Sequence, residues 1–315
     1  MDTDWSKLTI HIGMPKCAST SLQCNFFSNA GFPYLGPTNV HFNFRDGLEE
    51  RFKYLLALST MEEHRYHSYR EEIESFLYQY FSPEQPGIIS DEGISCGYYG
   101  AIPEECNDRS VVARRYAELF PGAKILLIIR NQPDFLASLF GEWNRRTFIH
   151  SPDIHRWFRE CLNLHTNMVS NPLCMPDFAG IYQIYSELFE GRVKVLPLEQ
   201  LKMDSRSFLN EVAEYAEINV TDDIFVQTMD KKLNTRIKPF EKIVYTFFVN
   251  HPRLRNLIPG DFRKPLYSLV GKVSSELQVE FDAWEKQKIN DIYASGNRIL
   301  VEKTGLQLDS LGYPI

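Results

Sequence analysis

The sequence predicts an α/β protein with a central parallel sheet that helices cover on both faces. Short apolar segments bounded by turn residues alternate with segments of helical periodicity, which is the pattern of β-α-β units. The segment KILLII at 124–129 is apolar without alternation, as expected for a strand buried on both faces. At 315 residues the chain can bury a substantial core, and we expect 1–315 to form a single domain.

The composition is that of an ordinary globular protein, with 43% hydrophobic and 24% charged residues. The net charge of −7 argues against broad binding to nucleic acid, although it allows a local basic pocket. We find neither a signal segment nor a stretch approaching ~20 apolar residues, so we expect a cytoplasmic protein without an integral membrane segment. None of the six cysteines forms a CxxC pair, and we expect no disulfide framework.

The expected strands are short and apolar, and they lie at Leu8–Ile12, Ile88–Ser90, Lys124–Ile129 and Val193–Leu196. Helices are expected over 107–120 and 178–189, because apolar side chains recur there every three or four residues. Strands that alternate with helices in this way are typical of a parallel sheet.

Two parts of the chain depart from this alternation. Residues 31–87 are too long for a simple crossover, and they are expected to hold one or two amphipathic helices. We favour an insertion that shapes the substrate cleft, with plain packing as the alternative. From about Asn234 the chain is expected to be mostly helical. An apolar stripe is expected there at Phe281, Trp284, Ile289, Ile292 and Tyr293.

The segment HRYH contains the nearest approach to a pair of metal ligands, His64 and His67. Their spacing fits one face of a helix, but no third ligand is evident. We therefore favour a polar helix face and expect no metal.

The segment IHIGMPKCASTSLQ at 10–23 has the layout of an anion site. A strand ends at Gly13, and a helix is expected to begin near Ser19. The first N–H groups and the dipole of such a helix attract negative charge. Lys16 adds a full positive charge in the turn. We expect a phosphate or sulfate group to bind to the loop formed by Pro15, Lys16, Cys17, Ala18, Ser19, Thr20 and Ser21.

This loop differs from the triphosphate-binding loop, whose pattern is GxxxxGK[ST]. Lys16 comes only three residues after Gly13, and no Gly-Lys-Ser/Thr follows. No strand-end aspartate suited to Mg²⁺ is evident, so the anion is expected to bind without a metal. Cys17 lies at the helix start, where the pKa of its thiol could fall. We interpret it as a space-filling residue and not as a nucleophile.

The segment HIGMPKCASTSLQ resembles the 5′-phosphosulfate loop of the PAPS-dependent sulfotransferases, whose pattern is Pro-Lys-x-Gly-Thr-Thr-x-Leu. Pro15, Lys16 and Thr20 match that pattern, while Ala18 stands for glycine and Ser19 for threonine. The methyl group of Ala18 is a departure close to the ligand. The resemblance implies a three-layer fold like that of the P-loop NTPases, and 3′-phosphoadenosine 5′-phosphosulfate (PAPS) as co-substrate.

A second segment, KILLIIRNQPDFLASLFGEW, resembles the family's 3′-phosphate site, which is an arginine at a strand end with a serine eight residues later. Arg130, Asn131, Asp134 and Ser138 keep that order and spacing. The proline lies one place later, at Pro133, where it suits the first turn of a helix. Ligands of open α/β sheets bind at the carboxyl ends of the strands, and a guanidinium suits a phosphate. The alternative for the arginine is a structural salt bridge.

Sulfuryl transfer to a hydroxyl needs electrostatic stabilisation, for which we expect Lys16, and a base. In the family a catalytic histidine or, in several carbohydrate sulfotransferases, a glutamate follows the corresponding strand, so the resemblance implies Glu92 as the base. Asp91 is an alternative, because strand alternation sends the two side chains to opposite faces. His11 is a further alternative, although its position is more typical of a core histidine.

The segment DKKLNTRIKP at 230–239 is a basic cluster in an acidic protein. The resemblance implies a late basic loop that closes over the nucleotide, in which Arg236 and Lys232 are expected contacts. A solvated loop is the alternative.

The leading hypothesis is a PAPS-dependent sulfotransferase acting on a hydroxyl of a carbohydrate, a lipid-linked molecule or a small metabolite. A P-loop kinase that uses ATP is one alternative. A non-catalytic protein that binds PAPS or its product, adenosine 3′,5′-bisphosphate (PAP), is the other.

Overall fold

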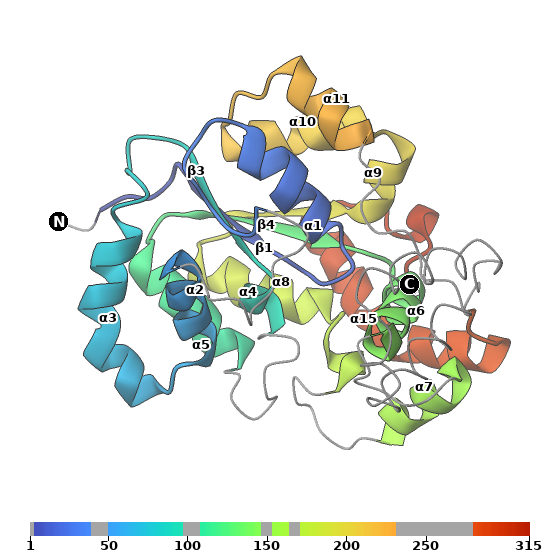
Figure 1. The fold of residues 1–315 in the computed structure, drawn as a ribbon. Coiled ribbons are helices and arrows are strands. Elements are labelled where there is room, and N and C mark those ends of the chain that lie inside the picture. Colours follow the sequence, from blue (N-terminus) through green and yellow to red (C-terminus); the bar gives the residue numbers. More distant parts are fainter. Residues whose placement is uncertain (1–2, 39–49, 97–107, 146–152, 164–170, 231–279) are drawn as a thin grey trace, which may run out of the picture.

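The computed structural model of the chain describes residues 3–38, 50–96, 108–145, 153–163, 171–230 and 280–315. Its centre is a five-stranded sheet in the order β2-β3-β1-β4-β5, and every strand pair in it is parallel (Figure 1). The strands are β1 Leu8–Ile12, β2 Tyr34–Leu35, β3 Gly87–Asp91, β4 Lys124–Ile129 and β5 Val193–Pro197. The predicted α/β fold with a central parallel sheet is confirmed.

All four predicted strands are present in this sheet. Residues Ile125 to Ile129 of β4 are fully buried, as their unbroken apolar pattern predicts for a strand with neighbours on both sides. The sequence does not predict β2, because two residues carry no periodicity. This strand pairs with β3 at the edge of the sheet.

Helices cover both faces of the sheet and give the fold three layers (Figure 1). The segment that begins with α1 lies on one face together with α10 and α11, and α5, α8 and α15 pack on the other. The bounds are α1 Ser19–Ser21, η1 Leu22–Phe26, η2 Phe27–Asn29, α2 Glu50–Thr60, α3 Glu63–Leu77, α4 Gly93–Cys96, α5 Arg109–Leu119, α6 Gln132–Arg145, α7 Ile154–Asn163, η4 Pro172–Cys174, α8 Phe178–Leu188, α9 Leu198–Met203, α10 Ser205–Ala216, α11 Asp222–Asp230, α15 Ala283–Thr304 and η5 Asp309–Leu311.

The two helices predicted from periodicity, α5 and α8, are confirmed. Each begins at an aspartate that caps it: Asp108 accepts a hydrogen bond from Ser110 N, and Asp177 accepts one from Gly180 N. Such caps satisfy amide groups that have no partner within the helix.

The apolar stripe expected near α15 is correct in part. Phe281, Ile289 and Tyr293 are buried, whereas Trp284 is 48% and Ile292 is 39% exposed. The error has a physical cause, since only the side of α15 that packs on α6 and α8 is covered. The rest of the helical region expected from Asn234 falls largely in 231–279, outside the described residues.

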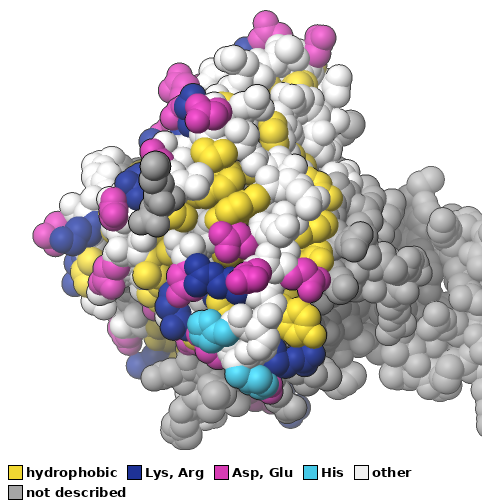
Figure 2. All heavy atoms as spheres, turned by 90° about the vertical axis from the view of Figure 1, so that its left-hand side faces the viewer, with side chains coloured by type: hydrophobic (Ala, Val, Ile, Leu, Met, Phe, Trp, Pro, Cys, Tyr) yellow, Lys and Arg dark blue, Asp and Glu magenta, His cyan; other side chains and the backbone are white. Residues whose placement is uncertain are grey.

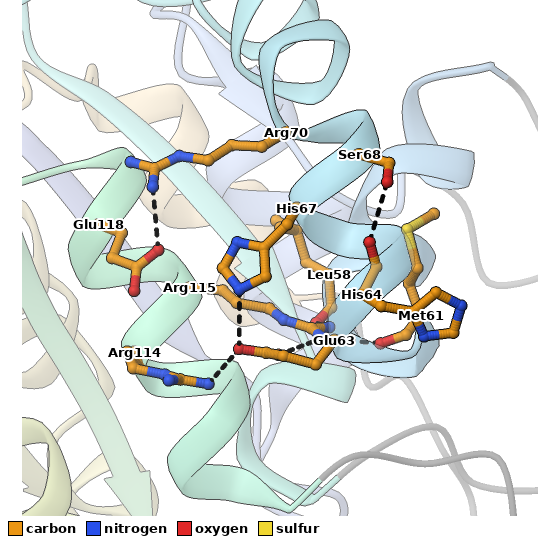
Figure 3. Close-up of polar contacts among 10 residues, drawn as sticks. All are labelled: Leu58, Met61, Glu63, His64, His67, Ser68, Arg70, Arg114, Arg115 and Glu118. Carbon is orange, nitrogen blue, oxygen red and sulfur yellow. Dashed lines mark hydrogen bonds and ion pairs between the residues drawn. The ribbon is translucent and has the colours of Figure 1, made fainter.

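The insertion at 31–87 contains the predicted amphipathic helices, which are α2 and α3, and α2 packs on α3, α4 and α5. A wholly buried arginine of α5, Arg115, holds this arrangement (Figure 3). It donates to the carbonyl oxygens of Leu58 at 2.9 Å and Met61 at 2.7 Å, and to the carboxylate of Glu63 at 2.8 Å. Its guanidinium lies over the ring of Tyr66, 4.4 Å from the centroid.

The two histidines of the HRYH segment lie on the outer face of α3. The side chains of His64 and His67 are 75% and 58% exposed, and each lies near a glutamate, at 3.6 Å from Glu62 and 3.5 Å from Glu63. Figure 2 shows histidines among charged side chains on this side of the molecule. The interpretation as a polar helix face is confirmed.

Replacing Arg115 should destabilise the protein far more than replacing its neighbour. In Arg115→Met the carbonyl groups of Leu58 and Met61 lose their donor inside the protein, at an expected cost of about 3 kcal/mol in the free energy of unfolding. Arg114 contacts the same Glu63 but its side chain is 46% exposed, so Arg114→Met should cost less than about 1 kcal/mol. Urea unfolding of both variants tests this difference, and equal losses would contradict it.

Candidate functional site

The candidate site lies at the edge of the sheet where its parallel strands end. The loop from Gly13 follows β1, Glu92 follows β3, Arg130 follows β4 and Glu199 follows β5 within two residues. β1 is paired with β3 on one side and with β4 on the other, so the first three of these segments are direct neighbours. This edge is where open α/β sheets bind their ligands.

The loop after β1 has an unusual backbone. Lys16 and Ala18 have φ angles of 64° and 61°, which lie in the left-handed region that residues other than glycine rarely adopt. Each such residue costs roughly 1 kcal/mol or more, and residues of this kind concentrate where ligands bind. Ala18 is the N-cap of α1 and has no side-chain capping hydrogen bond. The amide groups at the helix start therefore lack a partner from the capping side chain.

The predicted loop residues fall into two groups. Pro15, Cys17 and Ser19 are buried, and the hydroxyl of Ser19 donates to the carbonyl oxygen of Met14 at 2.7 Å. By contrast, Lys16, Ala18, Thr20 and Ser21 are partly exposed. The buried group packs within the turn, and the second group is in part accessible at its surface.

Gly13 allows this loop to touch the loop that holds Glu92. A Cβ atom at Gly13 would lie 3.0 Å from both the carbonyl carbon of Asp91 and the amide nitrogen of Glu92, so only glycine fits without a shift of backbone. The amide of Gly13 donates to the carbonyl oxygen of Asp91 at 3.1 Å. The hydroxyl of Ser95 donates to the carbonyl oxygen of Gly13 at 2.9 Å.

Arg130 joins the loop from the other side. Its Nη1 donates to the carbonyl oxygen of Lys16 at 3.2 Å, which places the two predicted phosphate-binding segments in direct contact. Its Nη2 lies 3.7 Å from Asp134, so a salt bridge is present, although Asp134 is 49% exposed and such pairs contribute little. The Nε atom has no hydrogen-bond partner in the structure as described, which leaves one donor of this guanidinium unused.

The sequence does not reveal a third participant, Glu142. Its carboxylate lies 3.6 Å from the Nζ atom of Lys16, and both side chains are largely buried, with 16% and 20% exposed. Asp134, Ser138 and Glu142 are spaced four residues apart on α6 and so share one helix face. Because Asp134 contacts Arg130 and Glu142 contacts Lys16, Ser138 lies between them on the face toward the loop. Glu142 follows Ser138 by four residues, about one helical turn, and this spacing is the signal that could have identified it in the sequence.

Cys17 lies among the charges of this site. Burial raises the pKa of its thiol, which Arg130 and Lys16 lower and Glu199 and Glu92 raise further. The possibility that its pKa falls at the helix start is therefore wrong. The space-filling interpretation is confirmed, because the side chain is fully buried, and any contact of Cys17 with a ligand would involve its backbone.

Glu92 and Asp91 point to opposite faces of the sheet, as strand alternation predicts. Glu92 is half-buried and close enough to the thiol of Cys17 to raise its pKa. Asp91 is buried and accepts a hydrogen bond from the amide of Gly93 at 3.0 Å. It adds to the rise that burial produces in the pKa of Tyr116, a residue of α5 on the far face. Of the two carboxylates, Glu92 lies on the side of the loop.

His11 is a core histidine, as its position in β1 suggests. Its imidazole is fully buried and its Nδ1 lies 2.7 Å from the hydroxyl of Ser90, which also accepts a hydrogen bond from Gln23 at 2.9 Å. Burial lowers the pKa of His11 to about 3, so the imidazole is neutral near pH 7. Its conjugate acid is strongly disfavoured, which makes it a poor acceptor for a substrate proton.

Glu199 is a further residue that the sequence does not reveal. It is 8% exposed, and its Oε1 accepts hydrogen bonds from the backbone amide of Asn131 at 3.2 Å and from its side-chain amide at 2.9 Å. Its Oε2 accepts one from the hydroxyl of Tyr313 at 2.9 Å. A carboxylate two residues after an apolar strand, at the same sheet edge as Arg130, is the signal that could have drawn attention to it.

Some expectations fall outside the described residues, among them the contacts of Arg236 and Lys232. The described part of the chain has four cysteines with described side chains, all free: Cys17, Cys24, Cys161 and Cys174. Among the described helices, none is long and apolar enough to cross a membrane.

The buried imidazole of His11 should make stability depend on pH. Its pKa in the folded protein, about 3, lies below the ordinary histidine pKa of 6.5, so between these two pH values the unfolded chain binds a proton that the folded chain does not. The contribution of the neutral, buried His11 to the free energy of unfolding is complete above pH 6.5. It is lost as the pH falls toward 3, by about 1.4 kcal/mol per pH unit. Between pH 7 and pH 5 the wild type should therefore lose about 2 kcal/mol more stability than His11→Gln, measured by urea unfolding. Parallel losses in the two proteins would contradict this assignment.

No protein-family model and no curated protein matches the sequence. Among solved structures, the chain is similar to a sulfotransferase from Alicyclobacillus acidocaldarius, with a TM-score of 0.54 and 12% sequence identity over 96% of this chain and 97% of the other. The sulfotransferase domain of the curacin biosynthetic pathway gives a TM-score of 0.39 and 11% identity over 73% of this chain and 78% of the other. The sulfotransferase domain of the Synechococcus PCC 7002 olefin synthase gives a TM-score of 0.36 and 13% identity over 73% of this chain and 78% of the other. The chain therefore has the fold of the Alicyclobacillus acidocaldarius sulfotransferase over nearly its whole length.

Proposed function

We propose that the protein is a sulfotransferase that moves the sulfuryl group of PAPS to an acceptor hydroxyl and releases PAP. The observation that carries this proposal is the hydrogen bond from Arg130 to the carbonyl oxygen of Lys16. It joins a strand-end guanidinium to the backbone of the loop that carries the Lys16 ammonium group, which supports two adjoining cationic sites. A nucleotide with phosphate groups at both its 3′ and 5′ positions needs two such adjoining sites.

The two phosphate-bearing ends of the donor would bind to different elements. Lys16, the partly exposed hydroxyl groups of Thr20 and Ser21 and the amides of the helix start would hold the 5′-phosphosulfate. Arg130, which has an unused Nε donor, and Ser138 on the adjoining face of α6 would hold the 3′-phosphate. No metal is needed in this scheme, because the cations of the chain supply the positive charge. Arg236 stays a proposed contact.

The reaction would be an in-line displacement at sulfur. Glu92 accepts the proton of the acceptor hydroxyl, the acceptor oxygen bonds to sulfur, and the bond from sulfur to the bridging phosphate oxygen breaks. Negative charge grows on the leaving bisphosphate, where Lys16 neutralises it. The ammonium group lies beside Glu142, and we propose that the donor displaces this contact.

The helical insertion would form the acceptor side of the site. The hydroxyl of Ser59 in α2 donates to the carbonyl oxygen of Gly93 at 3.3 Å, directly after the proposed base. This contact supports the proposal that the insertion at 31–87 shapes an acceptor cleft beside Glu92. The acceptor class we propose is a hydroxyl of a carbohydrate, a lipid-linked molecule or a small metabolite in the cytoplasm, and not a nucleic acid.

Incubation with PAPS labelled in its sulfuryl group and a panel of sugars, lipids and phenols tests the activity. Transfer of label that persists in EDTA supports the proposal. Transfer from labelled ATP that EDTA abolishes would identify a kinase instead. Tight binding of PAP without transfer to any acceptor would identify a binding protein.

Removing the guanidinium of Arg130 should weaken binding of the 3′-phosphate. For Arg130→Ala we expect a loss of PAP affinity of ~1.5–3 kcal/mol, as for a charged hydrogen bond, with the affinity for AMP almost unchanged. Isothermal titration calorimetry of both nucleotides measures this. Arg206→Ala is the control, because Arg206 is a surface residue that pairs with Asp222 and stacks on Phe225. An unchanged PAP affinity in Arg130→Ala would overturn the assignment of the 3′-site.

Removing the charge of Glu92 should slow the chemical step and spare nucleotide binding. Glu92→Gln should reduce kcat by about a hundredfold, the usual contribution of a general base, with the Kd for PAP unchanged. Lys16→Ala should abolish transfer. Asp91→Asn is the control. It should lower the stability of the protein, because Asp91 holds the amide of Gly93, and it should change kcat much less than Glu92→Gln does. Full activity of Glu92→Gln would remove this residue as the base.

A further inference from the structure

The C-terminal segment of the chain reaches the candidate site. After η5, Gly312 has a φ of 81° and turns the chain, and the amide of Tyr313 donates to the carbonyl oxygen of Leu308 at 3.2 Å. Leu308 and Tyr313 are both buried, with 0% and 4% exposed. Figure 1 shows the end of the chain beside α6, the helix that follows Arg130. The tail is thus a packed part of the fold.

A pair of side-chain amides ties this tail to the start of α6. Asn297 of α15 and Gln132, the first residue of α6, exchange two hydrogen bonds of 2.9 and 3.1 Å. The same Asn297 donates to the carbonyl oxygen of Pro314 at 2.8 Å. Both amides are buried, so these bonds are well shielded from water.

Tyr313 and Glu199 continue this network to the residue next to Arg130. The hydroxyl of Tyr313 donates to one oxygen of Glu199 at 2.9 Å, and the other oxygen accepts both amides of Asn131. The side-chain oxygen of Asn131 accepts a hydrogen bond from the amide of Asp134 at 2.9 Å and so caps α6. Every polar group in this chain of contacts has a partner.

The hydroxyl of Tyr313 is also close to the charges of the site. Burial raises its pKa, Glu199 and Cys17 raise it further, and Arg130 lowers it. The phenol therefore stays protonated at neutral pH, and it remains a donor to the carboxylate. It lies within electrostatic reach of Arg130, the guanidinium proposed to bind the 3′-phosphate.

We infer that Tyr313 is a positioning residue for recognition of a 3′-phosphate, acting through Glu199 and Asn131 on Arg130. The phenol occupies the second oxygen of Glu199 and holds this carboxylate on Asn131. Without it, the carboxylate can turn to the guanidinium and compete with the phosphate, since carboxylate and phosphate bind a guanidinium in the same way. This inference rests on the proposed function, and it makes the last residues of the chain part of the nucleotide site.

The test compares PAP with AMP, which lacks the 3′-phosphate, by isothermal titration calorimetry. Tyr313→Phe should lower PAP affinity by about tenfold, within the range for one hydrogen bond to a charged group, and leave AMP affinity within about twofold. Tyr215→Phe is the matched control. Tyr215 lies on α10, is buried in part, and donates a hydrogen bond from its hydroxyl to the carbonyl oxygen of Arg192 at 2.9 Å. It should keep the full preference for PAP even where thermal stability falls.

A second variant tests the competing charge. Glu199→Gln in the Tyr313→Phe background removes the carboxylate that would turn to Arg130, so it should restore most of the preference for PAP. An equal loss of PAP and AMP in Tyr313→Phe, or a preference that the double variant fails to restore, would overturn the inference.

The wild type separates this inference from the proposed function. If wild-type protein prefers PAP to AMP and Tyr313→Phe keeps that preference, the role of Tyr313 is wrong and the 3′-site stands. If wild-type protein shows no preference for PAP, the proposed 3′-site is wrong and the inference falls with it.

Discussion

The hydrogen bond between Arg130 and the carbonyl oxygen of Lys16 is the contact on which the candidate site depends. It exists because β1 and β4 are neighbours in parallel register, with Ile12 opposite Leu127. Both strands end within three residues of that pair, so the loop of one and the arginine of the other leave the sheet side by side. Adjacent strands are only about 4.8 Å apart, so the side chain of Arg130 can reach the backbone of the neighbouring loop.

Each of the two cations of this site lies beside a carboxylate. Lys16 lies beside Glu142 and Arg130 beside Asp134, while Glu199 is turned toward Asn131. A weakly charged anion gains little by displacing such partners, because each displaced carboxylate must be solvated again. A ligand with several charges can compete for both cations at once. Under the proposed function, such pairing would let an acidic protein bind a multiply charged anion without a broad positive surface.

The sheet and the two cations could be predicted from the sequence, because their signals are local. Apolar runs predict the four longer strands, Arg130 comes directly after one of them, and Lys16 lies in the short turn after another. Residues whose roles come from distant contacts carry no such signal. Glu199 meets Asn131 across 68 positions and Tyr313 across 114, and nothing near either of them in the sequence indicates this pairing. The same limit explains Trp284 and Ile292, whose exposure depends on what packs against α15 and not on its own periodicity.

Different parts of the fold support the proposed donor side and the proposed acceptor side of the site. On the donor side, the loop and Arg130 are fixed by the sheet itself, whose strands have buried neighbours. On the acceptor side, the turn after Glu92 is held by Gly13 from the sheet and by Ser59 from the helical insertion. The insertion in turn is anchored to α5 by a buried guanidinium that holds two backbone carbonyls. Among the described residues, a change in the insertion reaches the proposed base directly, through the hydrogen bond of Ser59, the packing of α2 on α4 and the pairing of β2 with β3, whereas it reaches Arg130 through β3 and β1. Acceptor preference can vary on such a scaffold while the geometry of the anion site stays the same.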